Sequence, residues 1–370
     1  MSLVYSEDDR MLADTAEEFL SSKSPVSAQR ALRDNPSQLN YDADIWQQMT
    51  ELGWTAITFP EALGGLEFGY KGLGAIFESL GKHLAASPML SSVVLCGSLL
   101  EQLANEQQLT WLNSIISGEK RLALAIDEQA RHQPDNIETK AKSDGDGFLL
   151  SGTKVMVMDG VSPDAWIVSA AHEGGCSLFI VPFSDQVSIK RTKLVDSRNY
   201  AQLTFNELKL PATALLGKAG KASSALNHAL DLGRLCLSSE MLGASKALFD
   251  MTIEYLKTRE QFGVKIGTFQ ALQHRAARCY AELELAQSCV ISALSSADKP
   301  NTELGTDVSL AKWKVSKVAD LITAEAIQMH GGIGVTDELD IGLYLKRVRV
   351  AQMSLGDADF HQARYASLKG

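Results

Sequence analysis

The spacing of hydrophobic positions changes twice along the 370-residue chain. Up to about residue 120, and again from about residue 221, apolar residues recur at the interval of a helical turn, which is typical of amphipathic helices. Between these parts the apolar runs are short or alternate with polar residues, which is typical of strands. The pattern predicts an α+β protein with domains at 1–120, 121–220 and 221–370.

The middle part reads as a compact all-β unit. The runs that predict its strands are residues 122–126, 137–141, 148–150, 166–168, 177–182 and 201–205. Residues 144–147, with the sequence Asp-Gly-Asp-Gly, form a strong hairpin signal, because Asp-Gly favours the tight turns that match the twist of paired strands. We therefore expect this unit to stand between two helical ones.

The last part predicts long helices at 222–258, 269–298, 304–330 and about 338–352. Such lengths suit a four-helix bundle, which often also forms an oligomer contact. Pro300 is expected to stop the second of these helices, and Thr268 is expected to cap its start. Near the beginning of the chain, Ser6 followed by three acidic residues predicts a capped first helix.

Composition and charge narrow the possible function classes. The formal net charge of −10 argues against general binding to nucleic acid or to an anionic membrane. No apolar run is long enough to span a bilayer, and residues 1–9 lack the basic and apolar regions of a signal peptide. Five scattered cysteines without CxxC spacing indicate thiols of a reducing compartment and no metal site. We expect a soluble, cytoplasmic protein.

Two breaks between the long helical patterns carry candidate chemistry. In residues 259–273, Gly263 and Gly267 permit a tight loop after a helix that ends near Arg259. Arginine has a planar fork suited to phosphate, although an arginine near a helix end is more often a solvated charge. In residues 328–334, Gly331 alone would be an ordinary helix cap. With Gly332 beside it, backbone amides can also approach a phosphate closely.

Taken together, Arg-x-Gln-Phe-Gly-x(6)-Gln from residue 259 and Gln-x-His-Gly-Gly-x-Gly from residue 328 resemble the acyl-CoA dehydrogenase family. Leu-Gly-Trp at 52–54 with Pro-Glu-x-x-Gly-Gly at 60–65 is similar to that family's N-terminal domain. The resemblance covers nearly the whole chain. It implies an N-terminal helical domain, a central β-barrel domain and a C-terminal four-helix bundle.

The resemblance also implies FAD, bound across a subunit interface. The residues that match the family's FAD contacts are Arg259, Gln261, Phe262, Gln270, Gln328, Gly331 and Gly332. The last three would contact the cofactor from the opposing subunit. Each also has a plain structural explanation, Phe262 as core and the glycines as a cap. Asp231 and Arg234 match positions near the CoA substrate, or they form an ordinary ion pair on a helix face.

The implied reaction is the α,β-dehydrogenation of an acyl-CoA thioester. A carboxylate takes the α proton, the β hydride passes to FAD, and an electron-transfer flavoprotein normally receives the electrons. The protein supplies orientation, hydrogen bonds and a dry pocket.

The segments that face the flavin in the family are altered here. Where the family has Thr-Glu-Pro-x-x-Gly-Ser-Asp, this chain has residues 127–134 and keeps only Glu128. In the following Gly-x-Lys-x-Trp-Ile-Thr segment, Met156 replaces the tryptophan and Met158 replaces the threonine beside flavin N5. Methionine can fill an apolar gap but offers no hydroxyl. Weakened flavin binding is expected.

The catalytic carboxylate is absent from both places where the family carries it. Gly233 stands at the position on the first bundle helix, and Leu355 stands at the position after the last long helix. General-base help is typically worth about 10²–10⁴ in rate, so its loss would largely silence the reaction. Asp357 and Asp359 lie near the expected place as candidate substitute bases, but acids just after a glycine are more often solvated or cap the next helix.

These departures are similar to a branch of the family in which one subunit of a hetero-oligomer lacks the glutamate and completes a partner's FAD site. The first hypothesis is therefore an acyl-CoA dehydrogenase subunit that works in a homo- or hetero-oligomer with a catalytic homologous subunit. A non-redox acyl-CoA-binding or scaffolding homologue is the second. A related flavin oxidase or monooxygenase is the third.

Overall fold

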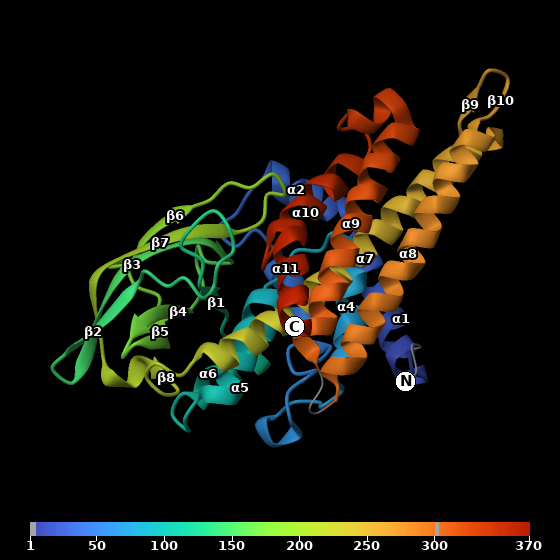
Figure 1. Cartoon of the computed structure of the whole chain (residues 1–370). Helices are drawn as coiled ribbons and strands as arrows, with labels where there is room; N and C mark the ends of the chain where they lie inside the picture. The colour runs from blue at the N-terminus through green and yellow to red at the C-terminus, as the bar shows by residue number, and fades with distance from the viewer. Residues whose placement is uncertain (1–4, 300–302) are drawn as a thin grey trace. The chain divides into compact units, whose positions relative to one another are not determined.

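The computed structural model describes residues 5–299 and 303–370 (Figure 1). The helices are α1 (Glu7–Lys23), α2 (Val26–Asp34), α3 (Ala43–Glu51), α4 (Tyr70–Lys82), α5 (Ser98–Leu103), α6 (Leu109–Ile116), α7 (Ser223–Thr258), α8 (Gln270–Ala297), α9 (Leu304–His330), α10 (Ile341–Met353) and α11 (Ala358–Lys369). Shorter helical turns are η1 (Glu61–Leu63), η2 (Met89–Gly97), η3 (Ala212–Ala214), η4 (Ile266–Thr268) and η5 (Gly331–Val335).

The strands fall in two sheets. They are β1 (Leu122–Ala125), β2 (Lys140–Asp144), β3 (Gly147–Met158), β4 (Ala165–His172), β5 (Gly175–Pro182), β6 (Ser188–Arg191), β7 (Tyr200–Leu210), β8 (Leu215–Leu216), β9 (Glu260–Gln261) and β10 (Val264–Lys265). β9 and β10 form a separate two-stranded hairpin, and the other strands form one mixed sheet.

The chain forms two compact units that interleave in sequence. Of the described residues, one unit takes those up to Asp34, Gly69–Ala85 and those from Arg234 onward. The second unit takes Asn35–Phe68 and Ala86–Gly233. The expected domain limits at residues 120 and 220 stay a prediction.

Local sequence signals explain the starts of two helices in the first unit. Ser6 and Asp9 form a reciprocal capping box at α1, in which each side chain accepts a hydrogen bond from the other's backbone amide. α4 is capped from a distant part of the chain, because Asp298 accepts hydrogen bonds from the amides of Tyr70 (2.5 Å) and Lys71 (3.2 Å). Both devices satisfy amides that a helix leaves unpaired at its start.

Two glycines let α4 and α7 cross in close contact. A Cβ at Gly81 would lie 1.8 Å from the Glu240 carbonyl oxygen, and a Cβ at Gly243 would lie 1.8 Å from that of Glu78. No side chain fits at either position, so the two backbones touch. The contact holds α4 and α7 together.

The sheet of the second unit has the order β6-β7-β3-β2-β4-β5-β8, with β1 added beside β4. β1 and β2 both run parallel to β4, and the other pairs are antiparallel. Its core includes Trp166, Phe179 and Phe205, all at most 1% exposed. Over the described residues the pairing leaves β6 and β8 as edges, so the sheet is open where a closed barrel was expected.

Most expected elements are confirmed. The long helices predicted at 222–258, 269–298, 304–330 and 338–352 correspond to α7 through α10, and Asp144 pairs with Gly147 across the expected hairpin. The prediction for Thr268 was wrong: its hydroxyl donates to the Lys265 carbonyl, and Phe269 occupies the cap position without a side-chain bond. The expected stop at Pro300 lies outside the described residues. α11 and the short strands β6, β8, β9 and β10 were not predicted.

Candidate cofactor and active site

The first candidate motif forms a protruding hairpin at the junction of α7 and α8 (Figure 1). β9 and β10 pair through Gln261 with Val264, and the two turn residues Phe262 and Gly263 both have positive φ, +56° and +78°. Such a turn matches strand twist but disfavours a bulky residue at its first position. The phenyl ring of Phe262 is nevertheless 91% exposed and meets only the edge of Phe269, with ring centres 6.2 Å apart.

The polar side chains of this motif face outward. Arg259, Gln261 and Gln270 are exposed. Within the described part of the chain, no acceptor bonds the guanidinium of Arg259, whose backbone amide donates to the Tyr255 carbonyl at 2.9 Å. An exposed, uncommitted guanidinium fits a bidentate contact with a phosphate.

The second candidate motif ends α9. Gly331, at φ +65°, caps the helix, and its amide donates to the Gln328 carbonyl. No heavy atom lies within 4 Å of a Cβ placed at Gly331 or at Gly332. By contrast, a Cβ at Gly334 would lie 2.9 Å from the Ile327 carbonyl oxygen. Packing therefore explains Gly334, whereas Gly331 and Gly332 border open space that a ligand's phosphate or ring can enter.

The structure brings the two motifs together through a contact that the sequence did not reveal. The rings of Tyr255, one turn before Arg259, and His330, just before Gly331, stack with centres 4.2 Å apart. His330 also accepts a hydrogen bond at its carbonyl from the Tyr255 hydroxyl, at 3.4 Å. Burial lowers the pKa of His330, which keeps the stacked ring neutral. The stack locks the ends of α7 and α9 side by side.

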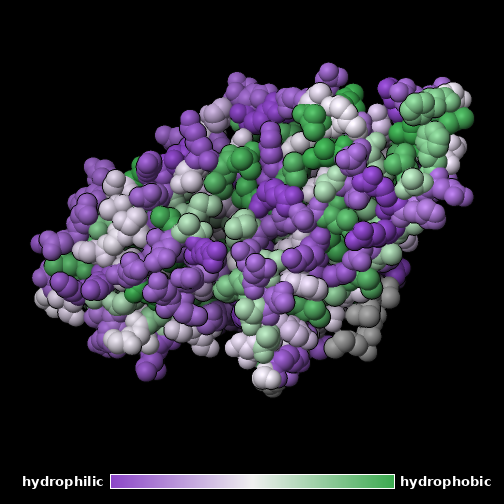
Figure 2. All heavy atoms as spheres, turned by 45° about the horizontal axis from the view of Figure 1, so that its top comes forward, coloured by the Kyte–Doolittle hydropathy of each residue, from purple (hydrophilic) through white to green (hydrophobic). Residues whose placement is uncertain are grey.

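Exposed apolar side chains surround these motifs. Phe262, Val264, Phe269 and Val335 are 91%, 42%, 38% and 75% exposed. Figure 2 shows hydrophobic surface at the hairpin end of the helices. Exposed patches of this kind mark protein or ligand contacts.

At the expected base position, an apolar side chain stands in a tightly held loop. Leu355 is 8% exposed and has φ +58°. Its carbonyl oxygen accepts hydrogen bonds from Arg234 Nε (2.9 Å) and His361 Nε2 (3.2 Å). Gly233, at the other expected position, is buried and has no side chain. Asp357 accepts a hydrogen bond from the Phe360 amide at 2.8 Å and caps α11, so it is a structural residue.

Lys312, like Arg234 and His361, holds the backbone of this loop. Its ammonium group is fully buried and donates to the carbonyls of Ala351, Gln352 and Gly356, at 3.0, 3.0 and 3.1 Å. Burial, with the nearby Arg234, lowers the pKa of Lys312 to about 7. The side chains of Arg234, Lys312 and His361 thus hold the backbone of residues 351–356. All of these hydrogen bonds go to backbone carbonyls and none to the side chain of residue 355.

The expected substrate-side residues lie on α7. Asp231 and Arg234 are 6% and 0% exposed. Beyond its bond to Leu355, Arg234 lies with its Cζ 5.2 Å from the centre of the Phe360 ring, a cation–π contact. Their expected contact with CoA stays a prediction.

In the second unit, Glu128 and Lys154, both retained from the family's flavin-facing segments, form a buried ion pair. Lys154 Nζ donates to Glu128 Oε1 (2.5 Å), to the Ile126 carbonyl (3.0 Å) and to Ser169 Oγ (2.9 Å). The Glu128 carboxylate also accepts hydrogen bonds from the amides of Glu138 and Thr139. The pair joins β1, β2, β3 and β4, so its retention has a structural reason.

The methionines of the flavin-facing segment sit at a bulge in β3. The register against β7 shifts between Lys154 and Val157, and Met156 has φ +53° and is 36% exposed. Met158 is half-buried. A bulge of this kind bends the strand locally and breaks its pairing.

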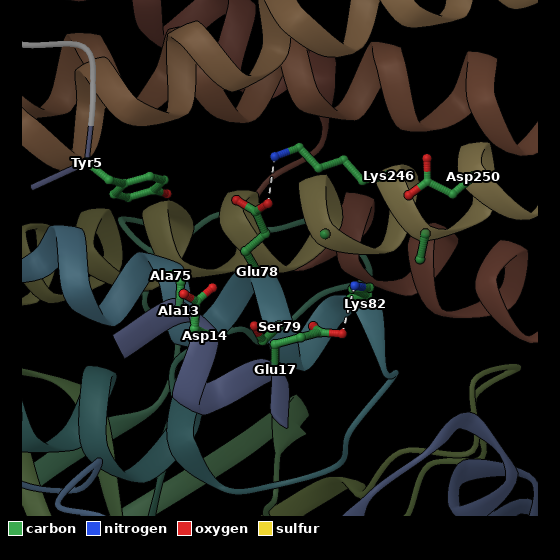
Figure 3. A pocket seen from close by; sticks show the side chains of 12 residues that line it. Tyr5, Ala13, Asp14, Glu17, Ala75, Glu78, Ser79, Lys82, Lys246 and Asp250 are labelled. Atoms are coloured by element: carbon green, nitrogen blue, oxygen red, sulfur yellow. Dashed lines mark hydrogen bonds and ion pairs between the residues drawn. The ribbon is translucent and has the colours of Figure 1, made fainter. Parts of the chain in front are cut away.

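The described residues also form pockets apart from Arg259 and Gly331. Figure 3 shows a cleft of about 250 Å³ lined by α1, α4 and α7, in which Lys82 pairs with Glu17 and Lys246 with Glu78. A second pocket, of about 370 Å³, lies in the β unit among the 134–137 loop, the β4–β5 turn and the start of α7. Within residues 5–299 and 303–370, no helix is long and apolar enough to cross a membrane.

The chain matches known proteins over almost its whole length. Residues 6–119 match the acyl-CoA dehydrogenase N-terminal domain and residues 223–366 match the acyl-CoA dehydrogenase C-terminal domain. The mitochondrial isovaleryl-CoA dehydrogenase of Pongo abelii is 29% identical, covering 96% of this chain and 86% of that protein.

Two solved structures show the same fold. The Tcur3481–Tcur3483 steroid ACAD, determined as a variant, has a TM-score of 0.88 and 28% identity, covering 98% of both chains. The ChsE4–ChsE5 complex from Mycobacterium tuberculosis has a TM-score of 0.90 and 26% identity, covering 99% of this chain and 98% of that one. The expected fold, enzyme class and FAD cofactor are confirmed at the level of the family. The chain belongs to the acyl-CoA dehydrogenase family.

Proposed function

We propose that this chain is an FAD-binding subunit of an acyl-CoA dehydrogenase, and that a homologous partner subunit supplies the proton-abstracting carboxylate. The observation that carries the proposal is Leu355. It stands where a base is needed, its loop is fully formed, and Asp357 is engaged in capping α11. The fold around the base is therefore intact while the base itself is missing.

The cofactor motifs fit FAD. Arg259 and Gln261 would hold its phosphates, with Phe262 and Gln270 beside them. Gln328, Gly331 and Gly332 would approach the cofactor of the opposing subunit. The exposed arginine and the open space at the two glycines support this assignment. When bound, FAD supplies the hydride-accepting chemistry of the reaction.

A second subunit explains the exposed apolar surface at the hairpin. Phe262 is 91% exposed in an unfavourable turn conformation, and a contact that covers the ring would offset the cost. A homologous subunit seated on this patch would complete both FAD contacts. The ChsE4–ChsE5 complex, which contains two kinds of subunit, supports an assembly of unlike chains.

The proposed substrate is an acyl-CoA thioester, and the electron acceptor is an electron-transfer flavoprotein. Asp231 and Arg234 would stand near the CoA. Arg234 would act there from a buried position, through the loop that it holds. A cytoplasmic location belongs to the same proposal.

The test measures the visible absorption spectrum and the acyl-CoA turnover of the protein purified alone and after co-expression with a homologous subunit that has the glutamate. The expected result is little dehydrogenation by the lone chain and a yellow, active complex with the partner. Robust turnover of an acyl-CoA by a homogeneous preparation would overturn the shared-base proposal. Absence of colour in both preparations would favour a non-redox scaffold.

A further inference from the structure

Two arginines of α2 bind the turn of residues 333–340, which joins the end of α9 to α10. Arg33 binds the Asp337 carboxylate through both terminal nitrogens, with Nη1 donating to Oδ1 at 2.6 Å and Nη2 to Oδ2 at 2.9 Å. Arg30 donates from Nη1 to the Asp337 carbonyl at 2.9 Å and from Nη2 to Asp340 Oδ1 at 2.6 Å. Arg33 and Asp337 are 304 positions apart, so the chain closes a long-range contact here.

These arginines are the external ties of the 333–340 turn. Within the turn the hydrogen bonds are local, because the Thr336 hydroxyl donates to the Ile333 carbonyl at 2.8 Å and accepts from the Glu338 amide at 3.4 Å. Over the described residues, every hydrogen bond that reaches 333–340 from an element other than α9 or α10 comes from Arg30 or Arg33. Beyond its attachment to the two helices, the turn is therefore placed by α2.

The contact differs from an ordinary surface ion pair. A single exposed pair stabilises little, whereas a bidentate arginine–carboxylate contact within a network fixes geometry. The side chains of Arg30 and Arg33 are only 25% and 21% exposed. Asp34 Oδ1 accepts from Arg33 Nε at 2.8 Å, which fixes the orientation of that guanidinium. The hydrogen bond from Arg33 lowers the pKa of Asp337 to about 2, so the carboxylate is charged at neutral pH.

The two candidate cofactor glycines directly precede this turn. No heavy atom lies within 4 Å of a Cβ placed at Gly331 or Gly332. On the helix side, the stack of His330 on Tyr255 fixes the end of α9. On the other side, the α2 arginines fix the turn that follows. Backbone amides bind a phosphate well only when they are already held in place, so both anchors matter for the glycine pair.

We propose that Arg30 and Arg33 are positioning residues for the cofactor, because they hold the 333–340 turn and thereby orient the Gly331–Gly332 backbone toward the FAD of the opposing subunit. The inference rests on the proposed function, which assigns these glycines to FAD. Neither arginine is assigned a contact with the cofactor, and both act through the turn.

The test uses FAD as the probe and the complex with a homologous subunit that has the glutamate. The FAD dissociation constant is measured by fluorescence quenching for the natural complex and for R30Q/R33Q, R33K and D337N in this chain. R349Q is the matched control, because Arg349 forms an exposed ion pair between α10 and α9 in the same unit. R259Q is the reference for a direct phosphate contact. Thermal unfolding without FAD is recorded for every variant.

R30Q/R33Q is expected to weaken FAD binding about tenfold, because the glycine backbone must then be ordered at the expense of binding. D337N should weaken it about threefold, since it keeps the carbonyl contact but loses the charged one. R33K should fall between the natural chain and R30Q/R33Q, because lysine keeps the charge without the planar fork. R349Q should leave the dissociation constant unchanged.

The outcomes separate this inference from the proposed function. If R30Q/R33Q and D337N bind FAD as tightly as R349Q while R259Q binds it more weakly, the inference is wrong and the proposed function stands. The inference is equally wrong if the variants at the turn lower only the unfolding midpoint, since the arginines would then be a brace for the fold. A natural complex that binds no FAD would overturn the proposed function and this inference with it.

Discussion

Replacing Lys154 by methionine tests whether the retained Glu128–Lys154 pair is the structural centre of the β unit. The substitution keeps most of the side-chain volume but leaves the Glu128 carboxylate, 6% exposed, with only two backbone amides as partners. It also removes the donor to the Ile126 carbonyl and Ser169. Removing one partner of a buried pair typically costs about 3–5 kcal/mol, and we expect K154M to lose that much.

The double variant E128Q/K154M separates the charge from the packing. It has no buried charge left, so it should recover about 2 kcal/mol relative to K154M, in the range measured for coupled neighbours. K209M, on the exposed face of β7, is the control and should stay within about 0.5 kcal/mol of the natural protein.

Urea unfolding followed by tryptophan fluorescence reports mainly on the unit that contains the Glu128–Lys154 pair. Trp46, Trp54, Trp111 and Trp166 lie in it, and Trp313 lies in the other. A loss of 4 kcal/mol would move the midpoint by roughly 1–2 M urea. The reasoning is wrong if the loss of unfolding free energy in E128Q/K154M equals the sum of the losses in E128Q and K154M. It is also wrong if K154M is as stable as K209M, because the pair would then not hold the strands together.

The pair also predicts a pH dependence. Burial alone would raise the pKa of Glu128, but Lys154 and the Thr139 amide bring it below its usual value. A carboxyl with a lowered folded-state pKa stabilises the fold above its unfolded value of about 4.3, and this contribution disappears as pH falls through the folded-state pKa. The pKa of Lys154 is also lowered, because burial of the ammonium outweighs the attraction of Glu128. E128Q should therefore show a flatter loss of stability in acid than the natural protein.

Three further changes probe other parts of the molecule. D298A removes the cap at Tyr70 and should cost about 1–2 kcal/mol of unfolding free energy in urea titrations, with no change in FAD binding. R259Q should weaken FAD binding at least tenfold, because it removes a charged contact with a phosphate. K265Q, on the same hairpin, is the control and should leave FAD binding unchanged. Equal effects of the two substitutions would contradict the assignment of Arg259. L355E should raise acyl-CoA turnover by about 10²-fold or more over the natural chain in a stopped-flow assay of flavin reduction, and no gain would show that more than the base is missing.

The helical plan could be predicted because its signals are local. α9 ends at the glycine where the helical pattern stops, and α7 ends beside Arg259, where its pattern runs out. Ser6 caps α1, as the acidic residues after it indicated. Thr268 failed as a cap for a physical reason: the 266–268 turn directs its hydroxyl back to Lys265. β6 is short and lies at an edge of the sheet, so it carries almost no periodic signal.

Candidate site residues could be predicted only where they belong to a recognisable sequence motif. Arg259 and the Gly331–Gly332 pair stand out as motifs, and the structure places both at exposed positions. The contacts that organise them join residues far apart in the chain, such as Tyr255 with His330 and Asp298 with Tyr70. In both pairs, the residue types and their separation in the chain give no signal of the contact, so the sequence alone could not predict it.

The loop at Leu355 is held through its backbone, so its conformation does not depend on the side chain at residue 355. Arg234, Lys312 and His361 all bind backbone carbonyls of residues 351–356, and a carbonyl is the same whatever side chain its residue carries. The loop conformation, including the positive φ at residue 355, is therefore independent of a glutamate there. The positive charge of Arg234, whose Nε donates to the Leu355 carbonyl, would favour the ionised form of an acid placed at residue 355, so L355E is a fair test of the proposed function.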